Sequence, residues 1–361
     1  MATREKNIFA ELDKDIGAVL LTNGSEPNLD LTFFYATGIT NGLFEECLAI
    51  VKKSGVEVIS SQLEELSSRQ AKVKTTVFEN SDERRRFLIK RIAGVRKIGI
   101  NFREITHANY VFIKKCAKGA KLVDVSEAIG RARMMKDEEE VARIKKACDI
   151  TSKAAIAIPQ LVRPGMKETE AAAELNYMMM KLGASGPAFE TNASFGPTTA
   201  EPHYVPASRR LAKGDFALFD FGAKYEKYVA DLTRTFVCGK PSKRHREMYE
   251  IVLEAQLAAI DAIRDGAHGK DVDNAARRII DTSPYKGRFI HGTGHGIGAS
   301  VHDPGFISSR RDMILRKGMV LTVEPGIYVK NFGGVRIEDD VLVTGSGCRI
   351  LTSAPKELIS L

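Results

Sequence analysis

The chain has 361 residues, of which 43% are hydrophobic and 28% are charged, and its formal net charge is +8 at pH 7. This composition is typical of a soluble globular protein, and the length suggests two domains. It excludes a low-complexity or repeat protein. The positive charge is spread along the chain without a known nucleic-acid-binding module, so a nucleic-acid partner is not expected.

The N-terminal segment, MATREKNIFAELDKD, is rich in charged residues and lacks the apolar run of a signal peptide. No uninterrupted apolar stretch is long enough to cross a membrane. The five cysteines are isolated and include no CxxC pair, which is typical of reduced packing residues. We therefore expect a cytoplasmic protein without a membrane segment.

Residues 1–128 mix short strands with helices, which predicts a smaller α/β domain. The expected strands are GAVLLT (17–22), CLAIVKKS (47–54), VEVISS (56–61) and KIGIN (97–101), and the expected helices are 83–92 and 106–115. No group of catalytic residue types gathers in this region.

Residues 129–361 predict a second, larger α+β domain. Asp137 and Glu140 form a capping-box start for a helix that we expect to end at Pro159. Further helices are expected at 168–182, 242–264 and from about residue 271, and strands at 319–324 and 335–343. The order of a helix pair followed by strands occurs twice, which suggests two similar halves around one sheet.

Between the two helix pairs, residues 215–236 alternate with a two-residue period, which predicts two paired strands with a turn at 222–227. Asp220 and Asp231 stand on faces of these strands that should be apolar. Because an unpaired buried carboxylate costs several kcal/mol, such groups are normally paired, hydrogen-bonded or bound to a metal ion. Two of them facing one point need a cation.

Further candidate site residues lie in turns and strands later in the chain. His291 and His295 lie in the run FIHGTGHGIGASVHD, where glycines let the backbone approach a ligand closely. Glu324 ends a strand that is cut by Pro325-Gly326, and Glu338 lies within an apolar strand, two residues after Arg336. Two aspartates, one histidine and two glutamates in apolar strands are difficult to explain without a metal.

The charge of the four carboxylates balances that of two divalent cations. Oxygen ligands with a single imidazole suit manganese, cobalt, zinc or ferrous iron better than copper. Two such ions roughly 3.5–4 Å apart can bridge one water and lower its pKa, which gives a hydroxide nucleophile at neutral pH. The sequence therefore predicts a dinuclear metal centre, with manganese or cobalt as the first candidates and zinc or iron as alternatives.

These five residues, with their surrounding sequences FDFG, ADLTRTF, HGTGHGIG, VEPGIY and VRIEDD, resemble the five metal ligands of the pita-bread metallopeptidases. That family includes Xaa-Pro dipeptidases (prolidases), Xaa-Pro aminopeptidases, methionine aminopeptidases and metal-free creatinases. The resemblance covers residues 134–361. It implies a pita-bread catalytic domain at 129–361, preceded by a creatinase-like N-terminal domain at 1–128, and it favours the proline-specific branch.

The resemblance also implies a role for each site residue. Asp220, Asp231, His295, Glu324 and Glu338 would bind the metal ions, with Asp231 and Glu338 bridging or chelating, and Glu324 would also carry a proton from the bridging water to the leaving nitrogen. His203 and His302 resemble the outer histidines that contact substrate and steady the oxyanion. His291 resembles a pocket residue, and Arg336 a residue that hydrogen-bonds near the ligand carboxylates.

The chain departs from the family at two points. Asp303 follows His302 where many members have glutamate, and Tyr204 follows His203 where many have a second histidine. The resemblance implies hydrolysis of the bond before proline in short Xaa-Pro peptides by a homodimer. The alternatives are an Xaa-Pro aminopeptidase that acts on longer peptides and a non-enzymatic binding protein on the same fold.

Overall fold

The computed structural model describes residues 4–361, so the first three residues of the charged N-terminal segment lie outside the described residues. The chain divides into two compact units, one that ends at Arg133 and one from Met134 to Leu361. The predicted boundary after residue 128 falls inside helix α6 (Ser126–Met134). Ile129 and Ala132 of this helix pack in a hydrophobic core of the first unit.

The first unit contains a six-stranded mixed sheet in the order β4-β3-β2-β1-β5-β6. The central strand β1 pairs antiparallel with β2 and parallel with β5. The strands are β1 (Ala18–Thr22), β2 (Leu48–Lys52), β3 (Gly55–Ser61), β4 (Lys74–Phe78), β5 (Lys97–Ile100) and β6 (Lys121–Asp124). The four strands predicted from the sequence are among them.

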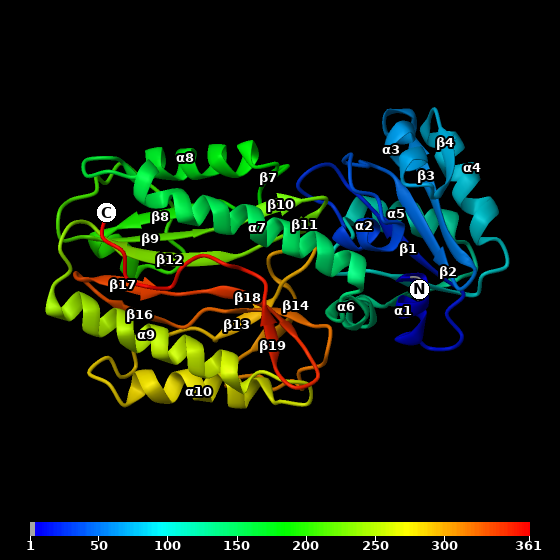
Figure 1. Cartoon of the computed structure of the whole chain (residues 1–361). Helices are drawn as coiled ribbons and strands as arrows, with labels where there is room; N and C mark the ends of the chain where they lie inside the picture. Colours follow the sequence, from blue (N-terminus) through cyan, green and yellow to red (C-terminus); the bar gives the residue numbers. More distant parts are fainter. Residues whose placement is uncertain (1–3) are drawn as a thin grey trace. The chain divides into compact units, whose positions relative to one another are not determined.

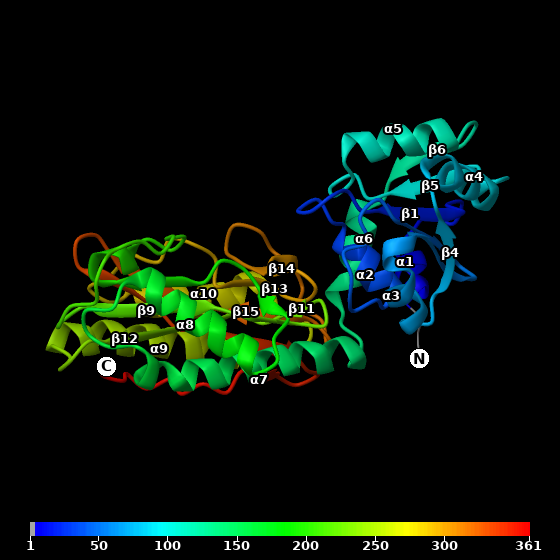
Figure 2. The same cartoon turned by 90° about the horizontal axis from the view of Figure 1, so that it is seen from above.

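Helices cover both faces of this sheet (Figure 2). One core joins α1, α2 and α6 to one face, and another joins α4 and α5 to the opposite face. The helices are α1 (Arg4–Ala10), α2 (Leu31–Thr37), the short η1 (Gln62–Glu64), α3 (Glu65–Gln70), α4 (Ser81–Ile92) and α5 (His107–Cys116). The predicted α/β layer is therefore present.

The second unit has four long helices: α7 (Glu138–Leu161), α8 (Glu168–Lys181), α9 (Lys243–Ala262) and α10 (Gly269–Asp281). The capping box of Asp137 and Glu140 is present at the start of α7. The prediction that Pro159 ends this helix was wrong, because α7 continues to Leu161. Proline in the last turn removes only one backbone hydrogen bond near the end of the helix, and the chain tolerates this.

The strands of the second unit lie between the two helix pairs (Figure 1). Helices α7 and α8 share one core with β8, β9, β10 and β12, and α9 and α10 share another with the later strands. The earlier strands are β7 (Gly186–Pro187), β8 (Asn192–Phe195), β9 (Phe216–Phe221), β10 (Ala223–Tyr225), β11 (Tyr228–Val229) and β12 (Leu232–Val237), with the short helix η2 (Gly196–Ala200) after β8. The later strands are β13 (Gly294–Gly296), β14 (Asp303–Ile307), β15 (Val320–Val323), β16 (Gly326–Val329), β17 (Gly333–Arg336), β18 (Asp339–Val343) and β19 (Cys348–Ile350).

The predicted strand pair is β9 and β12, which run antiparallel with Asp220 opposite Thr233. The predicted turn at 222–227 was wrong in part. Residues 223–229 instead form a second short hairpin, β10 and β11, with a turn at Glu226 and Lys227, whose φ angles of 47° and 69° are left-handed. This hairpin pairs with β7 in a sheet separate from that of β9 and β12.

The predicted strand 335–343 is broken at Ile337 and Glu338. Strand β17 before the break pairs with β16, whereas β18 after it pairs with β15 in a different sheet. The break places Glu338 where the chain passes from one sheet to the other. Among residues 4–361, no helix combines the length and the apolar character that a bilayer crossing requires.

Candidate metal centre

Two neighbouring strands position the aspartates. Asp220 lies in β9, and Asp231 directly precedes β12 and is 5% exposed. The backbone N–H of Asp231 donates to Asp340 Oδ2 at 3.0 Å, and Arg336 Nη2 donates to Asp220 Oδ2 at 2.5 Å. Arg336 therefore holds the Asp220 carboxylate from one side, and Asp340 holds the backbone of Asp231.

One side-chain oxygen of each aspartate has no hydrogen-bond partner among the described residues. Within residues 4–361, Oδ1 of Asp220 and Oδ1 of Asp231 are buried and receive no hydrogen bond. Buried carboxylate oxygens are nearly always paired, so these two atoms fit a site that completes itself with a cation.

The third carboxylate comes from the break between β17 and β18. Glu338 is 2% exposed, and Thr233 Oγ1 donates to its Oε2 at 2.6 Å. One ligand atom each from Asp231, His295 and Glu338 lie within 4.8 Å of one another. This spacing suits three ligands of one metal ion.

His295 in β13 points its free ring nitrogen at the carboxylates. Its Nδ1 lies 3.1 Å from the carbonyl oxygen of Gly296, which favours the tautomer with the proton on Nδ1 and leaves Nε2 as the acceptor. Nε2 lies 3.7 Å from Asp231 Oδ2 and 3.4 Å from Glu324 Oε1. Glu324 follows β15, and its backbone N–H donates to the carbonyl oxygen of Thr293 at 2.7 Å.

The pKa shifts of the clustered side chains also favour a bound cation. Burial raises the pKa of Asp231 and Glu338 well above the ordinary values, and the neighbouring carboxylates raise it further. Burial also raises the pKa of Glu324 and lowers that of the His295 imidazole. Ionised carboxylates at this density are costly without a compensating cation, and a neutral imidazole is the form that binds metal.

These side chains line one cavity of about 460 Å³ in the second unit. All of the site residues predicted from the sequence belong to its lining: His203, Asp220, Asp231, His291, His295, His302, Glu324, Arg336 and Glu338. Further lining residues include Phe189, Glu190, Asn192, Tyr204 and Val205.

The outer histidines differ from the inner one. His203 and His302 are exposed, and the ring of His302 lies 4.5 Å from that of His295. The pKa of His302 is lowered by partial burial and by the nearby His295 and His203. A neutral imidazole at the cavity can donate one N–H to a bound molecule without adding charge.

His291 and Arg336 already form hydrogen bonds with other groups of the protein. The two ring nitrogens of His291 lie 2.8 Å from Gly292 O and 2.8 Å from Tyr328 Oη. Arg336 donates to Thr233 Oγ1, Tyr328 Oη and Asp220 Oδ2, and it is 3% exposed. Burial raises the pKa of Tyr328 to about 12, so this hydroxyl stays protonated between the two residues.

Sequence reasoning missed three supporting residues. Tyr328 lies in VEPGIY, Thr233 in ADLTRTF and Asp340 in VRIEDD, each within four residues of a predicted metal ligand. Asp340 accepts from the Asp231 backbone and from the Cys148 thiol at 3.3 Å. The available signal was a hydroxyl or carboxyl group close to a predicted ligand, two residues after it for Thr233 and Asp340 and four residues after Glu324 for Tyr328.

A cavity in which buried carboxylates surround the His295 imidazole, on an α+β unit of paired helices and sheets, is the arrangement of a metal-dependent enzyme. Comparison with known proteins agrees. Residues 142–345 match Metallopeptidase family M24, and residues 10–135 match the Creatinase/Prolidase N-terminal domain. The chain belongs to metallopeptidase family M24, and it is a peptidase that uses divalent metal ions.

Relatives match along the whole chain. The Xaa-Pro dipeptidase of Pyrococcus horikoshii is 36% identical over 363 residues, with 99% of each chain covered. The solved structure of an Xaa-Pro dipeptidase from Bacillus anthracis has a TM-score of 0.90 at 33% identity, with 99% of each chain covered. An X-Pro aminopeptidase from Thermotoga maritima has a TM-score of 0.90 at 32% identity, covering 97% of this chain and 100% of the other. The predicted pita-bread fold with a creatinase-like N-terminal domain is confirmed.

Proposed function

We propose that this peptidase hydrolyses the peptide bond that precedes proline in short Xaa-Pro peptides, with two divalent ions in the cavity. The observation that carries the proposal is the convergence of Asp231, His295 and Glu338 within 4.8 Å, with Asp220 and Glu324 lining the same cavity. The printed names of the relatives, Xaa-Pro dipeptidase and X-Pro aminopeptidase, support the substrate class.

In this proposal Asp220, Asp231, His295, Glu324 and Glu338 are the metal ligands. The donor set of carboxylate oxygens and one imidazole suits manganese or cobalt, with zinc and iron as alternatives. The bound ions would lower the pKa of a water molecule and polarise the carbonyl group of the scissile bond.

Glu324 is the proton carrier. Its Oε1 lies 3.4 Å from His295 Nε2 in the lining of the cavity, and burial raises its pKa above that of an ordinary glutamate, which makes the carboxylate a stronger proton acceptor. It would take the proton of the attacking water and give it to the proline nitrogen as the C–N bond breaks. The proline nitrogen leaves as an amine only when it gains a proton, so the leaving group depends on this delivery.

His203 and His302 are proposed to contact the substrate. Both are exposed at the cavity, and a neutral His302 can donate an N–H to the oxyanion that develops on the carbonyl oxygen. His291 has both ring nitrogens engaged, so its contribution to the substrate pocket would be the edge of the ring. Arg336 would act by holding Asp220.

One observation favours the aminopeptidase alternative. A dipeptide places its carboxylate next to the proline ring, and that charge needs a cation. Among the described residues that line the cavity, Arg336 is the only lysine or arginine, and its guanidinium already donates to Asp220, Thr233 and Tyr328. A tripeptide, whose carboxylate lies further out, would suit this lining.

A three-substrate assay tests both proposals. The protein is freed of metal with a chelator, reloaded with manganese or cobalt, and offered Ala-Pro, Ala-Pro-Ala and Met-Ala. Cleavage of Ala-Pro or Ala-Pro-Ala that depends on the metal is expected. Ala-Pro cleaved faster makes it a dipeptidase, and Ala-Pro-Ala cleaved faster makes it an aminopeptidase. Cleavage of Met-Ala alone, or of none of the three, would overturn the proposed specificity.

A further inference from the structure

Arg234, in the middle of β12, is a buried arginine with all five of its N–H groups used. Its side chain is 3% exposed. Four of its acceptors are backbone carbonyl oxygens and one is a carboxylate, so the guanidinium joins segments that are far apart in the sequence. The acceptors, at 2.6–3.0 Å, are the carbonyl oxygens of Thr233, Glu338, Ala354 and Pro355 and the Oδ1 atom of Asp339.

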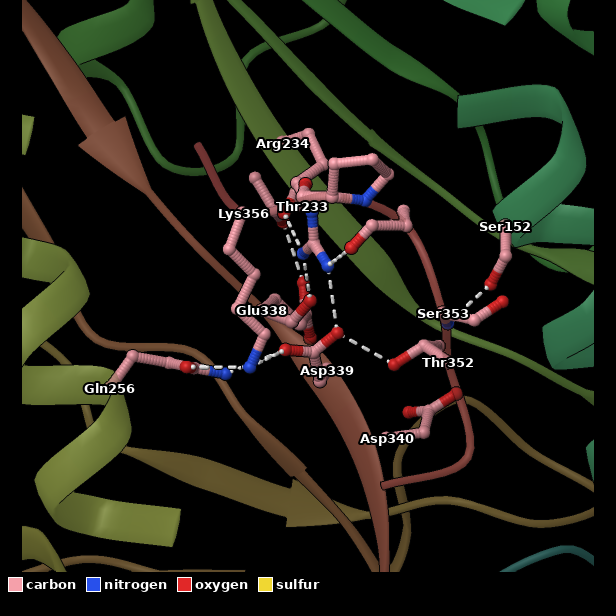
Figure 3. A network of polar contacts seen from close by, with 12 residues as sticks. Ser152, Thr233, Arg234, Gln256, Glu338, Asp339, Asp340, Thr352, Ser353 and Lys356 are labelled. Atoms are coloured by element: carbon pink, nitrogen blue, oxygen red, sulfur yellow. Dashed lines mark hydrogen bonds and ion pairs between the residues drawn. The ribbon is translucent and has the colours of Figure 1, made fainter. Parts of the chain in front are cut away.

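Asp339 completes the network, as Figure 3 shows. Its side chain is 1% exposed, and each of its oxygens accepts two hydrogen bonds or ion-pair contacts. The donors are Arg234 Nη2 (2.8 Å) and Thr352 Oγ1 (2.7 Å) on Oδ1, and Gln256 Nε2 (2.8 Å) and Lys356 Nζ (2.7 Å) on Oδ2. No acceptor position of this carboxylate is left for a ligand.

Thr233 and Arg234 form hydrogen bonds with both backbone polar groups of Glu338. The Glu338 N–H donates to the carbonyl oxygen of Thr233 at 3.2 Å, and the Glu338 carbonyl accepts from Arg234 Nη1 at 2.6 Å. Glu338 lies between β17 and β18 and belongs to neither strand, so strand pairing does not fix its position. The consecutive residues Thr233 and Arg234 supply that constraint instead.

Three consecutive acidic residues thus have three different surroundings. Glu338 lines the cavity, Asp339 faces Arg234 and Lys356, and Asp340 accepts from the backbone of Asp231. Displacement of the Asp339 side chain would pull on the peptide unit next to Glu338. Metal ligands need to be held to about 0.5 Å, and residues behind the ligands provide that precision.

The segment that contains residues 352–356 is part of this network. Thr352 and Lys356 contact Asp339, and the carbonyl groups of Ala354 and Pro355 contact Arg234. The same segment is tied to α7 by the Ser353 N–H, which donates to Ser152 Oγ at 2.9 Å, and to α9 by Tyr249.

We propose that Arg234 and Asp339 are positioning residues for the metal centre, and that segment 352–356 serves the centre by holding them. The inference rests on the proposed function, because it takes Glu338 as a metal ligand. Its consequence is that metal affinity depends on side chains that touch neither metal nor substrate.

A plain stabilising cluster is the rival explanation, and the experiment separates the two. Purified R234K and D339N are compared with wild type for Mn²⁺ affinity, from the electron paramagnetic resonance signal of free Mn²⁺, and for the melting temperature in chelator. The control is Y35F, which removes the hydrogen bond from the buried Tyr35 Oη to Ala132 O at 3.1 Å in the first unit and touches no residue of the network. K356M is a milder second variant, because it leaves every contact of Arg234 in place.

We expect R234K and D339N to lose about 10–100-fold in Mn²⁺ affinity, with a smaller loss in K356M and none in Y35F. R234K keeps the charge but cannot make the forked contacts, so it should resemble D339N. At saturating Mn²⁺, kcat should recover most of its value while KM for Ala-Pro-Ala stays near that of wild type.

Unchanged affinity in R234K, D339N and K356M, or a loss that Y35F shares in proportion to its melting temperature, would overturn the inference. If R234K and D339N do not fold, the comparison of K356M with Y35F decides the question. Wild type that binds no Mn²⁺ would instead refute the proposed function, so the two failures are distinguishable.

Discussion

The ammonium group of Lys136 lies 3.1 Å from the Asp303 carboxylate, and both side chains are almost fully buried, at 1% and 2% exposure. Lys136 directly precedes the capping box of α7, and its backbone N–H donates to Gly318 O. Asp303 directly follows His302, so the ion pair holds the loop that carries this histidine. The aspartate that departs from the family sequence therefore has a definite partner.

Removal of one member of this pair should destabilise the protein. K136M leaves the Asp303 carboxylate buried without its cation, which costs about 3–5 kcal/mol and lowers the melting temperature by roughly 6 °C or more. The double variant K136M/D303L should recover much of that loss, because it leaves no buried charge. Thermal unfolding of the metal-loaded variants measures this. A single variant as stable as wild type would show that the ion pair contributes nothing.

Metal binding should release protons and should strengthen as pH rises. In the metal-free protein, burial raises the pKa of Asp231, Glu338 and Glu324 above the unfolded values. The cost of ionising these groups is absent below the unfolded pKa of about 4 and grows as pH rises toward the folded pKa. A cation removes this cost by stabilising the ionised forms, so the carboxyl groups lose their protons when it binds.

The measurement is calorimetric titration of Mn²⁺ into the metal-free protein, in two buffers with different ionisation enthalpies. The gain in melting temperature on adding Mn²⁺ should be larger at pH 7.5 than at pH 5.5. A heat that does not depend on the buffer, with an equal gain at both pH values, would contradict the raised carboxyl pKa values.

Tyr204 should act as an anchor for the loop at the cavity. Its hydroxyl donates at 2.9 Å to Glu168, a fully buried carboxylate that also accepts from Phe195 N, Thr198 Oγ1 and Ala207 N. Burial and Glu168 raise the pKa of Tyr204 to about 12, so the hydroxyl remains a donor at neutral pH. The neighbouring His203 and Val205 line the cavity.

Y204F leaves the Glu168 carboxylate with one donor fewer, which costs about 1–3 kcal/mol. We expect KM for Xaa-Pro peptides to rise several-fold with a smaller change in kcat, because the loop that holds His203 loosens. The matched control is Y177F, the same change on an exposed face of α8, where Tyr177 is 61% exposed. Steady-state kinetics decide the point, and equal KM values in Y204F and wild type would mean that the loop needs no anchor.

The residues that line the cavity were easier to predict from the sequence than the contacts that support them. Asp220, Asp231, Glu324 and Glu338 could be found because charge in an apolar strand needs an explanation, and His295 because glycines surround it. The break at Glu338 could not be found, since it depends on β17 and β18 pairing with different strands. The contacts of Arg234 were equally hidden, because they join residues more than 100 positions apart.

Glu324 and Glu338 should respond differently to removal of their charge. Asp231, His295 and Glu338 form the tight cluster, whereas Glu324 stands beside it, with Oε1 3.4 Å from His295 Nε2. E338Q should therefore lose metal affinity first. E324Q should retain more metal but lose about 10²–10⁴-fold in kcat, because the amide can neither accept the proton of the attacking water nor deliver it to the proline nitrogen. Metal content of the purified variants, measured with kcat at saturating Mn²⁺, separates the two effects. Metal-loaded E324Q within tenfold of wild type in kcat would remove Glu324 from the proton transfer, and the hydrolysis would then need another carrier among the histidines of the cavity.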